Sequence, residues 1–349
     1  MKRMSHLIFL SLLIVVLSAC EKGVGDVDVL NSHGSIEGLE KMVHFYDNVQ
    51  NGVPSDLRIV HYTIEGDPII TDLSYDGKSF EVTYDTTRDK FGSGEITIIK
   101  CGNLIQEVNP TNTAYIAVDC EDDYYGMQEI LSIDYNVSQQ DLFEFELKYG
   151  SNQENEIDTL TNTVKNDNGT QTVGDLKITP EVKQEVYKRL VFANYLAPKD
   201  LSTKCDGEDA TNYYLKVHIN GGQREFKWNA CDQSSDGVKF TNIANYIIEQ
   251  SAKKQKVQRE ITVQGYVLEI KNNEMLIGED LTMLDYEWMK DELQSMNFED
   301  NYYHFTLLEG VDTKVFKPGD KILATIDGSI VGSKPGRAKV KGIKKIEVH

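Results

Sequence analysis

The chain has 349 residues, and its formal net charge of -20 excludes an extended nucleic-acid surface, which would need a positive field along the phosphates. The same charge disfavours adhesion of the protein surface to anionic lipid head groups. At roughly one domain per 100 to 200 residues, the length predicts two or three domains.

The N-terminus has the composition of a secretory signal. Two basic residues precede an apolar run over residues 7–16, and Leu-Ser-Ala stands directly before Cys20. This ending resembles the lipobox of bacterial lipoproteins, which implies that residues 1–19 are removed and that Cys20 is lipidated. The whole chain has a formal net charge of -20, and residues 1–19 hold two basic residues and no acid. Removing them therefore leaves a net charge of -22. The alternative is an ordinary signal peptide followed by a chance cysteine.

Residues 20–34 are short and polar, which predicts a tether from the lipid to the first fold. A first α+β module is expected over residues 35–135. It begins with a helix capped by Ser35, whose apolar residues recur at helical spacing: Ile36, Leu39, Val43, Tyr46 and Val49. Antiparallel strands follow, with Asp76-Gly77 as a hairpin turn.

A second α+β module is expected over residues 136–255, and we interpret the polar passage 122–140 as a connection. In this module Thr179-Pro180 predicts the start of a helix, because Thr is a good N-cap and Pro suits the first turn. Asn220-Gly221 predicts a second hairpin turn.

The last module is expected over residues 259–349, after a basic linker. Five or so strands with one interposed helix predict a small OB-like β-barrel. The predicted fold class is therefore α+β, with two helix-plus-antiparallel-sheet modules followed by this barrel.

The last 90 or so residues contain a set of short motifs: Gly265-Tyr266-Val267, Met275-Leu276-Ile277, Trp288, His304 to Leu307, Phe316 to Lys321 and Ile326 to Ile330. In these motifs the region resembles the YobA-like domain of unknown function, which is found in lipoproteins of Gram-positive spore-forming bacteria. Residues 30 to about 250 resemble a second uncharacterised lipoprotein module. Its motifs are Asn31-Ser32-His33-Gly34, Glu65 to Ile69 and Tyr84-Asp85 through Arg88-Asp89 to Gly92. Both resemblances imply a location on the outer face of the membrane of a Gram-positive bacterium, and neither implies a reaction.

Four cysteines are left once Cys20 is assigned to lipid. An even number outside the cytoplasm predicts disulfides, and local order favours Cys101 with Cys120 and Cys205 with Cys231. Reduced, buried thiols are the alternative.

Two surfaces are candidates for recognition. Loops that hold Asp67, Tyr84, Asp85, Arg88 and Asp89 are expected at one end of the first sheet, where binding residues often lie. The alternative is that these residues only make turns and surface ion pairs.

The second candidate is a basic face on the last strand. Arg337, Lys339 and Lys341 share one face by the period of two, and such a face suits an anionic wall polymer such as a teichoic acid. The alternative is a solvated outer face.

The sequence shows no catalytic motif, and the histidines have no metal-ligand spacing. We therefore expect no metal and no cofactor, and our leading hypothesis is a lipid-anchored envelope protein that binds a protein or a wall polymer. Acidity favours a basic protein partner, and immunity against a secreted toxin stays open. The alternative is an extracellular enzyme whose carboxylates are dispersed in sequence, which two carboxylates converging in a cleft would favour.

Overall fold

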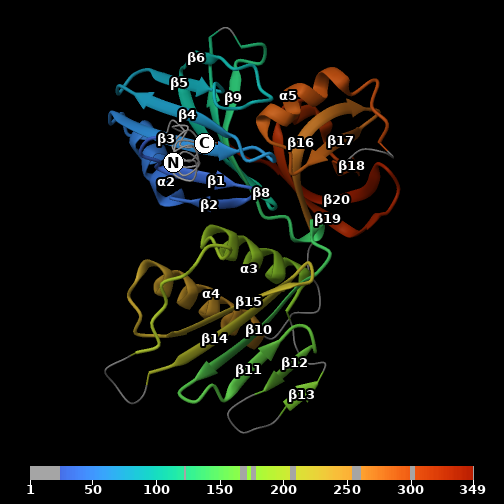
Figure 1. The fold of residues 1–349 in the computed structure, drawn as a ribbon. Helices are drawn as coiled ribbons and strands as arrows, with labels where there is room; N and C mark the ends of the chain where they lie inside the picture. Colours follow the sequence, from blue (N-terminus) through green and yellow to red (C-terminus); the bar gives the residue numbers. More distant parts are fainter. Residues whose placement is uncertain are drawn as a thin grey trace, which may run out of the picture.

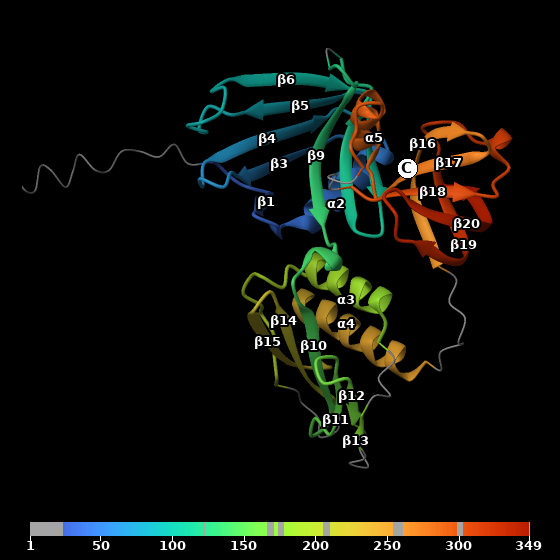
Figure 2. The ribbon, with the colours of Figure 1, turned by 90° about the vertical axis from the view of Figure 1, so that its right-hand side faces the viewer.

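The computed structural model describes residues 24–121, 123–165, 171–173, 178–204, 210–253, 261–298 and 303–348. Cys20 and Cys205 lie outside these ranges. The described chain is mixed α+β, with three open sheets, four α-helices and one closed barrel (Figures 1 and 2). No helix in the described part is both long enough and apolar enough to cross a membrane.

The first sheet has six strands, and all neighbours are antiparallel except β1 and β3. Its strand order is β2 (Ser35–Glu37), β1 (Val29–Ser32), β3 (Ser55–Tyr62), β4 (Pro68–Tyr75), β5 (Phe80–Asp85) and β6 (Ile96–Cys101). Helix α2 (Leu39–Gln50) covers one face, where Phe45 packs with its ring 6.0 Å from that of Phe80. The hairpin predicted at Asp76-Gly77 connects β4 to β5, as expected.

Two expectations for the start of this module are wrong. Strand β1 lies within the predicted tether and pairs with β3, so the first sheet begins earlier than residue 35. Ile36 belongs to β2 rather than to the helix, because a turn at His33-Gly34 folds β2 back onto β1. The helix starts after Gly38, which has a φ of 74° and has no room for a side chain: an added Cβ would lie 2.0 Å from the carbonyl oxygen of Asp28.

The bridging sheet, formed by β7 (Asn103–Val108), β8 (Asn112–Val118) and β9 (Met127–Asp134), lies between α2 and the barrel (Figure 2). Its first face contacts α2, where the rings of Tyr46 and Tyr115 are 5.8 Å apart. Strand β9 falls in the passage that we interpreted as a connection, and that interpretation is wrong. A bulge at Ile130 interrupts the period of two in β9, which explains why the pattern was not recognised.

The second sheet is antiparallel throughout. Its order is β13 (Gln171–Val173), β12 (Thr163–Lys165), β11 (Asn155–Asp158), β10 (Phe143–Gly150), β14 (Asn212–Ile219) and β15 (Gly222–Asn229). Helices α3 (Pro180–Phe192) and α4 (Ser235–Ala252) cover one face (Figure 2). As predicted, Thr179 caps α3 and Pro180 occupies its first turn.

The C-terminal region is a closed five-stranded barrel, as predicted. Around the barrel the order is β16 (Ile261–Lys271), β17 (Glu274–Glu279), β18 (Phe305–Glu309), β20 (Gly336–Lys345) and β19 (Lys321–Val331), with β18 and β20 parallel. Helix α5 (Met283–Glu292) follows β17 and starts with a capping box between Thr282 and Asp285. Strands β16 and β17 approach closely at Gly265, where an added Cβ would lie 2.2 Å from the carbonyl oxygen of Gly278.

Candidate functional site

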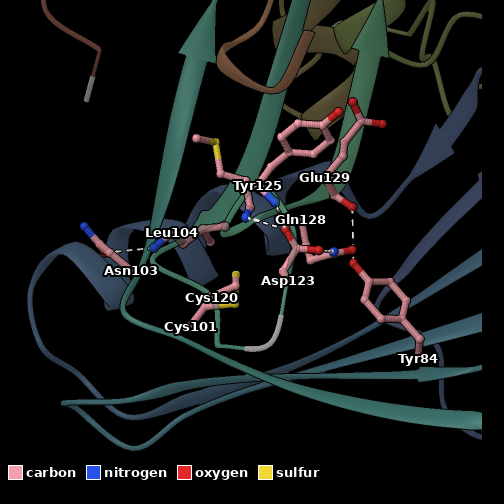
Figure 3. The surroundings of a disulfide bond; sticks show 10 residues. Tyr84, Cys101, Asn103, Leu104, Cys120, Asp123, Tyr125, Gln128 and Glu129 are labelled. Carbon is pink, nitrogen blue, oxygen red and sulfur yellow. Dashed lines mark hydrogen bonds between the residues drawn. A yellow bond between two sulfur atoms is a disulfide. The ribbon is translucent and has the colours of Figure 1, made fainter. Parts of the chain in front are cut away.

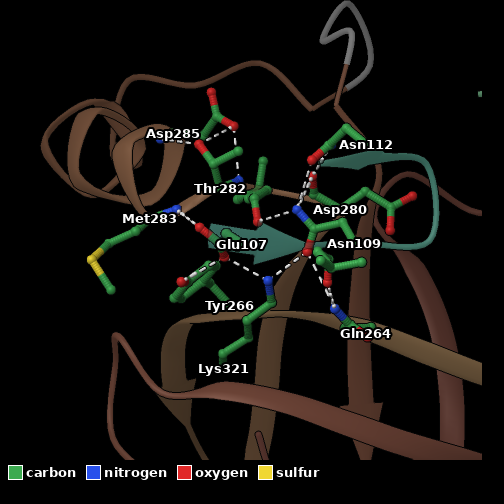
Figure 4. A network of polar contacts seen from close by, with 12 residues as sticks. Glu107, Asn109, Asn112, Gln264, Tyr266, Asp280, Thr282, Met283, Asp285 and Lys321 are labelled. Atoms are coloured by element: carbon green, nitrogen blue, oxygen red, sulfur yellow. Dashed lines mark hydrogen bonds and ion pairs between the residues drawn. The ribbon is translucent and has the colours of Figure 1, made fainter. Parts of the chain in front are cut away.

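A buried polar network joins the second face of the bridging sheet to the barrel (Figure 4). Glu107 of β7 and Lys321 of β19 form an ion pair with 2.5 Å between Oε1 and Nζ, and their side chains are 1% and 3% exposed. Lys321 also donates to Oδ1 of Asn109. Burial lowers the pKa of Lys321, whereas the charge of Glu107 opposes this change.

Both carboxylate oxygens of Glu107 are hydrogen-bonded. The hydroxyl of Tyr266 donates to Oε1 over 2.8 Å, and the backbone N–H of Met283 donates to Oε2 over 2.6 Å. Because strand β16, helix α5 and strand β19 all supply a donor, a single carboxylate from the bridging sheet fixes three parts of the barrel.

The loop between β7 and β8 extends this contact. Asn109 and Asn112 both donate to the backbone carbonyl of Asp280, and the hydroxyl of Thr111 donates to its carboxylate over 2.9 Å. Gln264 donates to the carbonyl of Val108 over 3.2 Å. The barrel is therefore docked on the bridging sheet by polar groups that are hydrogen-bonded to one another. A cleft lies beside these contacts, between the two docked parts.

The acidic cleft lies beside this network, between β8 and β9 on one side and the barrel on the other, and has a volume of about 320 Å³. Among the residues that the structure describes, five carboxylates line it: Glu129, Asp134, Glu279, Asp280 and Asp285. The described residues of the lining include one histidine, His304, and no Lys or Arg.

The bulge in β9 places two of these carboxylates on the face of the bridging sheet that meets the barrel. Asp134 pairs with Asn112 of β8, and Glu129 pairs with Ile116 of the same strand. Asn112 and Ile116 are four residues apart in β8 and therefore point to the same face, so their partners do as well. If β9 alternated regularly through Ile130 without a bulge, Glu129 would pair with Ala117 and face the α2 core instead.

Burial and neighbouring negative charges raise the pKa values of three carboxylates in the acidic cleft. Crowding by protein raises the pKa of Glu129, although its side chain remains at the exposed rim, and the charges of Asp285 and Asp134 raise it further. Burial raises the pKa of Asp134, with a further contribution from Asp285. Burial also raises the pKa of Asp280, together with the charge of Glu279. A cationic ligand would relieve this repulsion.

Aromatic side chains extend the acidic cleft along α5. A neighbouring hollow of about 470 Å³ shares Glu129, Asp285 and Tyr303 with it and is further lined by Tyr125 and Trp288. Trp288 is 43% exposed, and its ring lies 6.4 Å from that of Tyr303. Tyr303 donates to Oδ1 of Asp285 over 3.1 Å and so connects the aromatic and acidic parts.

The acidic cleft is not arranged as a metal site. Within the described ranges, no three His, Cys, Asp or Glu side chains are grouped as ligands for a metal ion. Asp285 is committed to capping α5, since it accepts from the N–H and the hydroxyl of Thr282.

The predicted recognition loops lie together at one end of the first sheet, where their charges are paired. Lys90 contacts Asp67 through both its side chain, at 2.7 Å, and its backbone N–H, at 3.1 Å. Arg88 pairs with Asp85, while Asp89 accepts from the N–H of Phe91 in a turn. These contacts correspond to the alternative in which the residues make turns and ion pairs.

Tyr84, the fifth predicted residue of these loops, lies at the disulfide side of the bridging sheet. Its hydroxyl donates to the carbonyl of Glu129 over 3.3 Å (Figure 3), and burial raises its pKa. It therefore supports the strand that carries Glu129 instead of forming part of a loop surface.

The predicted basic face has the expected orientation. Arg337, Lys339 and Lys341 are exposed, while Ala338 between them is buried. Arg337 is paired with two carboxylates, Glu274 at 3.3 Å and Glu309 at 3.0 Å. Its charge is thus compensated within the barrel.

The predicted disulfide between Cys101 and Cys120 is present and joins the end of the first sheet to the bridging sheet (Figure 3). Cys101 ends β6, and only Gly102 separates it from β7, so the bond holds the chain where it passes between the two sheets. The pairing of Cys231 with Cys205 stays a prediction.

Sequence reasoning missed the network and the acidic cleft. Tyr266 and Lys321 both stand in motifs that carried the YobA-like resemblance, but their partner Glu107 is 214 residues from Lys321. Strand β7 also contains the polar residues Asn103 and Gln106, so its pattern gave no signal that Glu107 is buried. No local pattern marked Glu129 or Asp134.

Comparison with known proteins gives matches at both ends of the chain. Residues 26–116 match a domain of unknown function (DUF4362). Residues 264–348 match a protein of unknown function (DUF3221). No curated protein matches the chain.

Two solved structures of YobA from Bacillus subtilis are similar to part of the chain. The solution NMR structure has 14% identity, covers 28% of this chain and 92% of that chain, and has a TM-score of 0.21. The crystal structure has 18% identity, covers 26% of this chain and 100% of that chain, and has a TM-score of 0.21. A TM-score this low supports no statement about fold or function. The chain therefore has two regions that match families of unknown function. Each contributes residues to the acidic cleft, whereas Glu129 and Asp134 lie in β9, outside both matches.

Proposed function

We propose that this protein is a lipid-anchored protein of the bacterial envelope that binds a basic protein partner through the acidic cleft. The observation that carries this proposal is the lining of the cleft, in which five carboxylates face a space of about 320 Å³ without a Lys or Arg among the described lining residues. Clefts between domains are common binding sites.

The chemistry of the acidic cleft favours an ammonium or guanidinium group. The raised pKa values of Glu129 and Asp134 show that the negative charges are held at a cost, which a cation would reduce. The exposed ring of Trp288 provides a face for a cation–π contact at the edge of the same hollow. A Lys or Arg side chain of a partner could pair with the carboxylates and also contact the ring of Trp288.

Titration calorimetry with a lysine-rich peptide tests the binding, with a peptide in which norleucine replaces lysine as the neutral comparison. We expect Glu129→Gln and Asp134→Asn each to weaken binding about tenfold, which is about 1.4 kcal/mol. The matched control is Glu65→Gln, which removes an exposed carboxylate outside the cleft. Equal losses in the control, or equal binding of both peptides, would contradict the cleft as the site.

The anchor is tested separately in cells. We expect Cys20→Ala to abolish incorporation of labelled palmitate and to prevent cleavage before residue 20. If labelled palmitate still enters the variant, Cys20 is not the lipid attachment site.

Within this proposal, the barrel is a YobA-like domain with an OB-like order of strands. The support is the match over residues 264–348 and a closed barrel in which the third and fifth strands are parallel. The remainder is proposed to form two helix-plus-sheet modules, with the acidic cleft at the junction of the first module and the barrel.

An extracellular hydrolase is the second candidate, and one observation favours it. Glu129 has a raised pKa and its charge interacts with those of Asp285 and Asp134 in the same cleft, as in enzymes that use one protonated and one ionised carboxyl group. The test is release of reducing ends from purified wall glycan. Turnover that Glu129→Gln abolishes would support the enzyme and contradict a function by binding alone.

A further inference from the structure

The described chain begins on the open face of the first sheet. The guanidinium Nη1 of Arg58 donates to the carbonyl of Val24 over 3.1 Å. Gly25 lies against the same group, since an added Cβ would be 2.6 Å from Nη1 of Arg58. Asp28 then pairs with Arg58 through the backbone, at 3.1 Å between N and O. Residues 24 and 25 are thus held against one side chain of β3.

This face is opposite to α2. Leu57, Leu73 and Val82 form one rung across β3, β4 and β5 and are buried toward α2. Arg58, Asp72 and Thr83 form the next rung and point the other way. The side chains of Arg58 and Asp72 are 35% and 41% exposed, so this face is open at the point where Val24 is held.

Large apolar side chains are exposed on the same face and at its loop end. Ile98 continues the rung of Arg58 onto β6 and is 60% exposed, and Ile96 is 58% exposed. Phe91, in the loop before β6, is 78% exposed, and Ile64, in the loop after β3, is 90% exposed. The contacts of Lys90 with Asp67 hold these two loops together.

The length of the chain before Val24 brings a lipid on Cys20 to this face. Val24 is the fourth residue after Cys20, so the two positions lie at most about 14 Å apart. β6 is three strands from β3, which is also about 14 Å. The chain is therefore long enough for a membrane that holds the lipid to contact the exposed apolar side chains without any rearrangement of the fold.

We infer that the open face of the first sheet docks on the lipid surface, with Ile64, Phe91, Ile96 and Ile98 entering the interfacial region. This inference rests on the proposed lipid attachment at Cys20. Part of the negative charge on this face is compensated, because Asp67, Asp72 and Asp85 are each paired with a basic side chain. Glu65, beside Ile64, is an exposed carboxylate that would stay in the aqueous layer. The lipid supplies the attachment, and the apolar residues set the orientation.

The test attaches the lipid chemically. A phospholipid thioester is joined to an N-terminal Cys20 by native chemical ligation, and the protein is added to vesicles of brominated phosphatidylcholine and phosphatidylglycerol, which quench tryptophan emission. Phe91→Trp and Ile64→Trp place reporters in the docking face. Leu160→Trp is the matched control, because Leu160 is 56% exposed and lies in the second sheet's module. Emission of the unsubstituted protein, from Trp228 and Trp288, is subtracted.

We expect the added tryptophan at 91 or 64 to lose a large part of its emission, because a side chain about 5–10 Å into the headgroup and acyl boundary lies near the bromine atoms, while the one at 160 keeps its emission. Equal quenching at all three positions, or none at any, would overturn the inference. A dimer in solution that Ile98→Asp dissociates would also overturn it, because a second copy would then cover this face. Since ligation supplies the lipid, a negative result here is independent of whether cells lipidate Cys20.

Discussion

Glu107→Gln tests whether the buried ion pair docks the barrel on the bridging sheet. The substitution keeps the shape of the side chain and removes its charge, so that Lys321, which is 3% exposed on its side chain, loses its ionic partner. Asn109 remains as a neutral hydrogen-bond partner. The variant therefore measures the cost of an uncompensated buried ammonium group.

The expected loss is about 3–5 kcal/mol at neutral pH, the usual cost of removing one partner of a buried pair. Deprotonation of Lys321 limits this cost. With an ordinary lysine pKa of about 10.4 in the unfolded state, neutralising the side chain at pH 7 costs at most about 4.6 kcal/mol, at 1.36 kcal/mol per pH unit.

The sign of the pH dependence follows from the direction of the pKa change. Burial lowers the pKa of Lys321 in the folded protein, and loss of Glu107 removes the charge that opposes this change. Between the folded and the unfolded pKa, the unfolded state binds more protons, so the variant gains stability relative to the original protein as the pH rises toward about 10.

Hydrogen exchange of the β19 amides measures the opening free energy of the barrel at pH 7 and pH 9. The matched control is Glu274→Gln, which removes one exposed partner of Arg337 and should leave the stability of the barrel nearly unchanged, because exposed ion pairs contribute little. A loss for Glu107→Gln as small as that of the control, with no recovery at higher pH, would refute the docking role of the pair.

Two further predictions concern the barrel and the acidic cleft. Gly265→Ala should destabilise the barrel by about 1–3 kcal/mol, because its Cβ would lie 2.2 Å from the carbonyl of Gly278; urea unfolding measures this, and an unchanged midpoint would contradict the close approach. Glu129→Gln should raise the melting temperature at pH 7, because it removes a carboxylate whose pKa is raised by crowding and like charges. A raised acid pKa means that the folded state holds its proton longer, so this gain should disappear as the pH falls toward about 4.3, the ordinary glutamate value; a gain that persists in acid would point to a different cause.

The two regions that match families of unknown function, residues 26–116 and 264–348, both contribute residues to the acidic cleft. Its walls come from β8 and β9, on one side, and from the end of β17 and α5, on the other. Neither wall alone encloses the carboxylates. We therefore expect docking through Glu107 and Lys321 to affect both the stability of the barrel and the shape of the proposed binding site.

The sequence alone was sufficient for features that depend on neighbouring residues. Asp76-Gly77 and Asn220-Gly221 predicted two hairpins because these residues accept the backbone angles of tight turns, and both hairpins are present. Thr179-Pro180 predicted the start of α3 through capping and a preset φ. The disulfide between Cys101 and Cys120 was predicted from cysteine count and order.

Only the tertiary structure decided which distant surfaces meet. Glu107 and Lys321 form their pair across 214 residues, and neither neighbourhood in the sequence specifies the other. The bulge at Ile130 turned Glu129 toward the barrel, since a shift of one residue reverses the face of every side chain beyond it. Local torsional preferences determine turns and caps, whereas the acidic cleft exists because two separately patterned surfaces pack against each other and bury a charge pair between them.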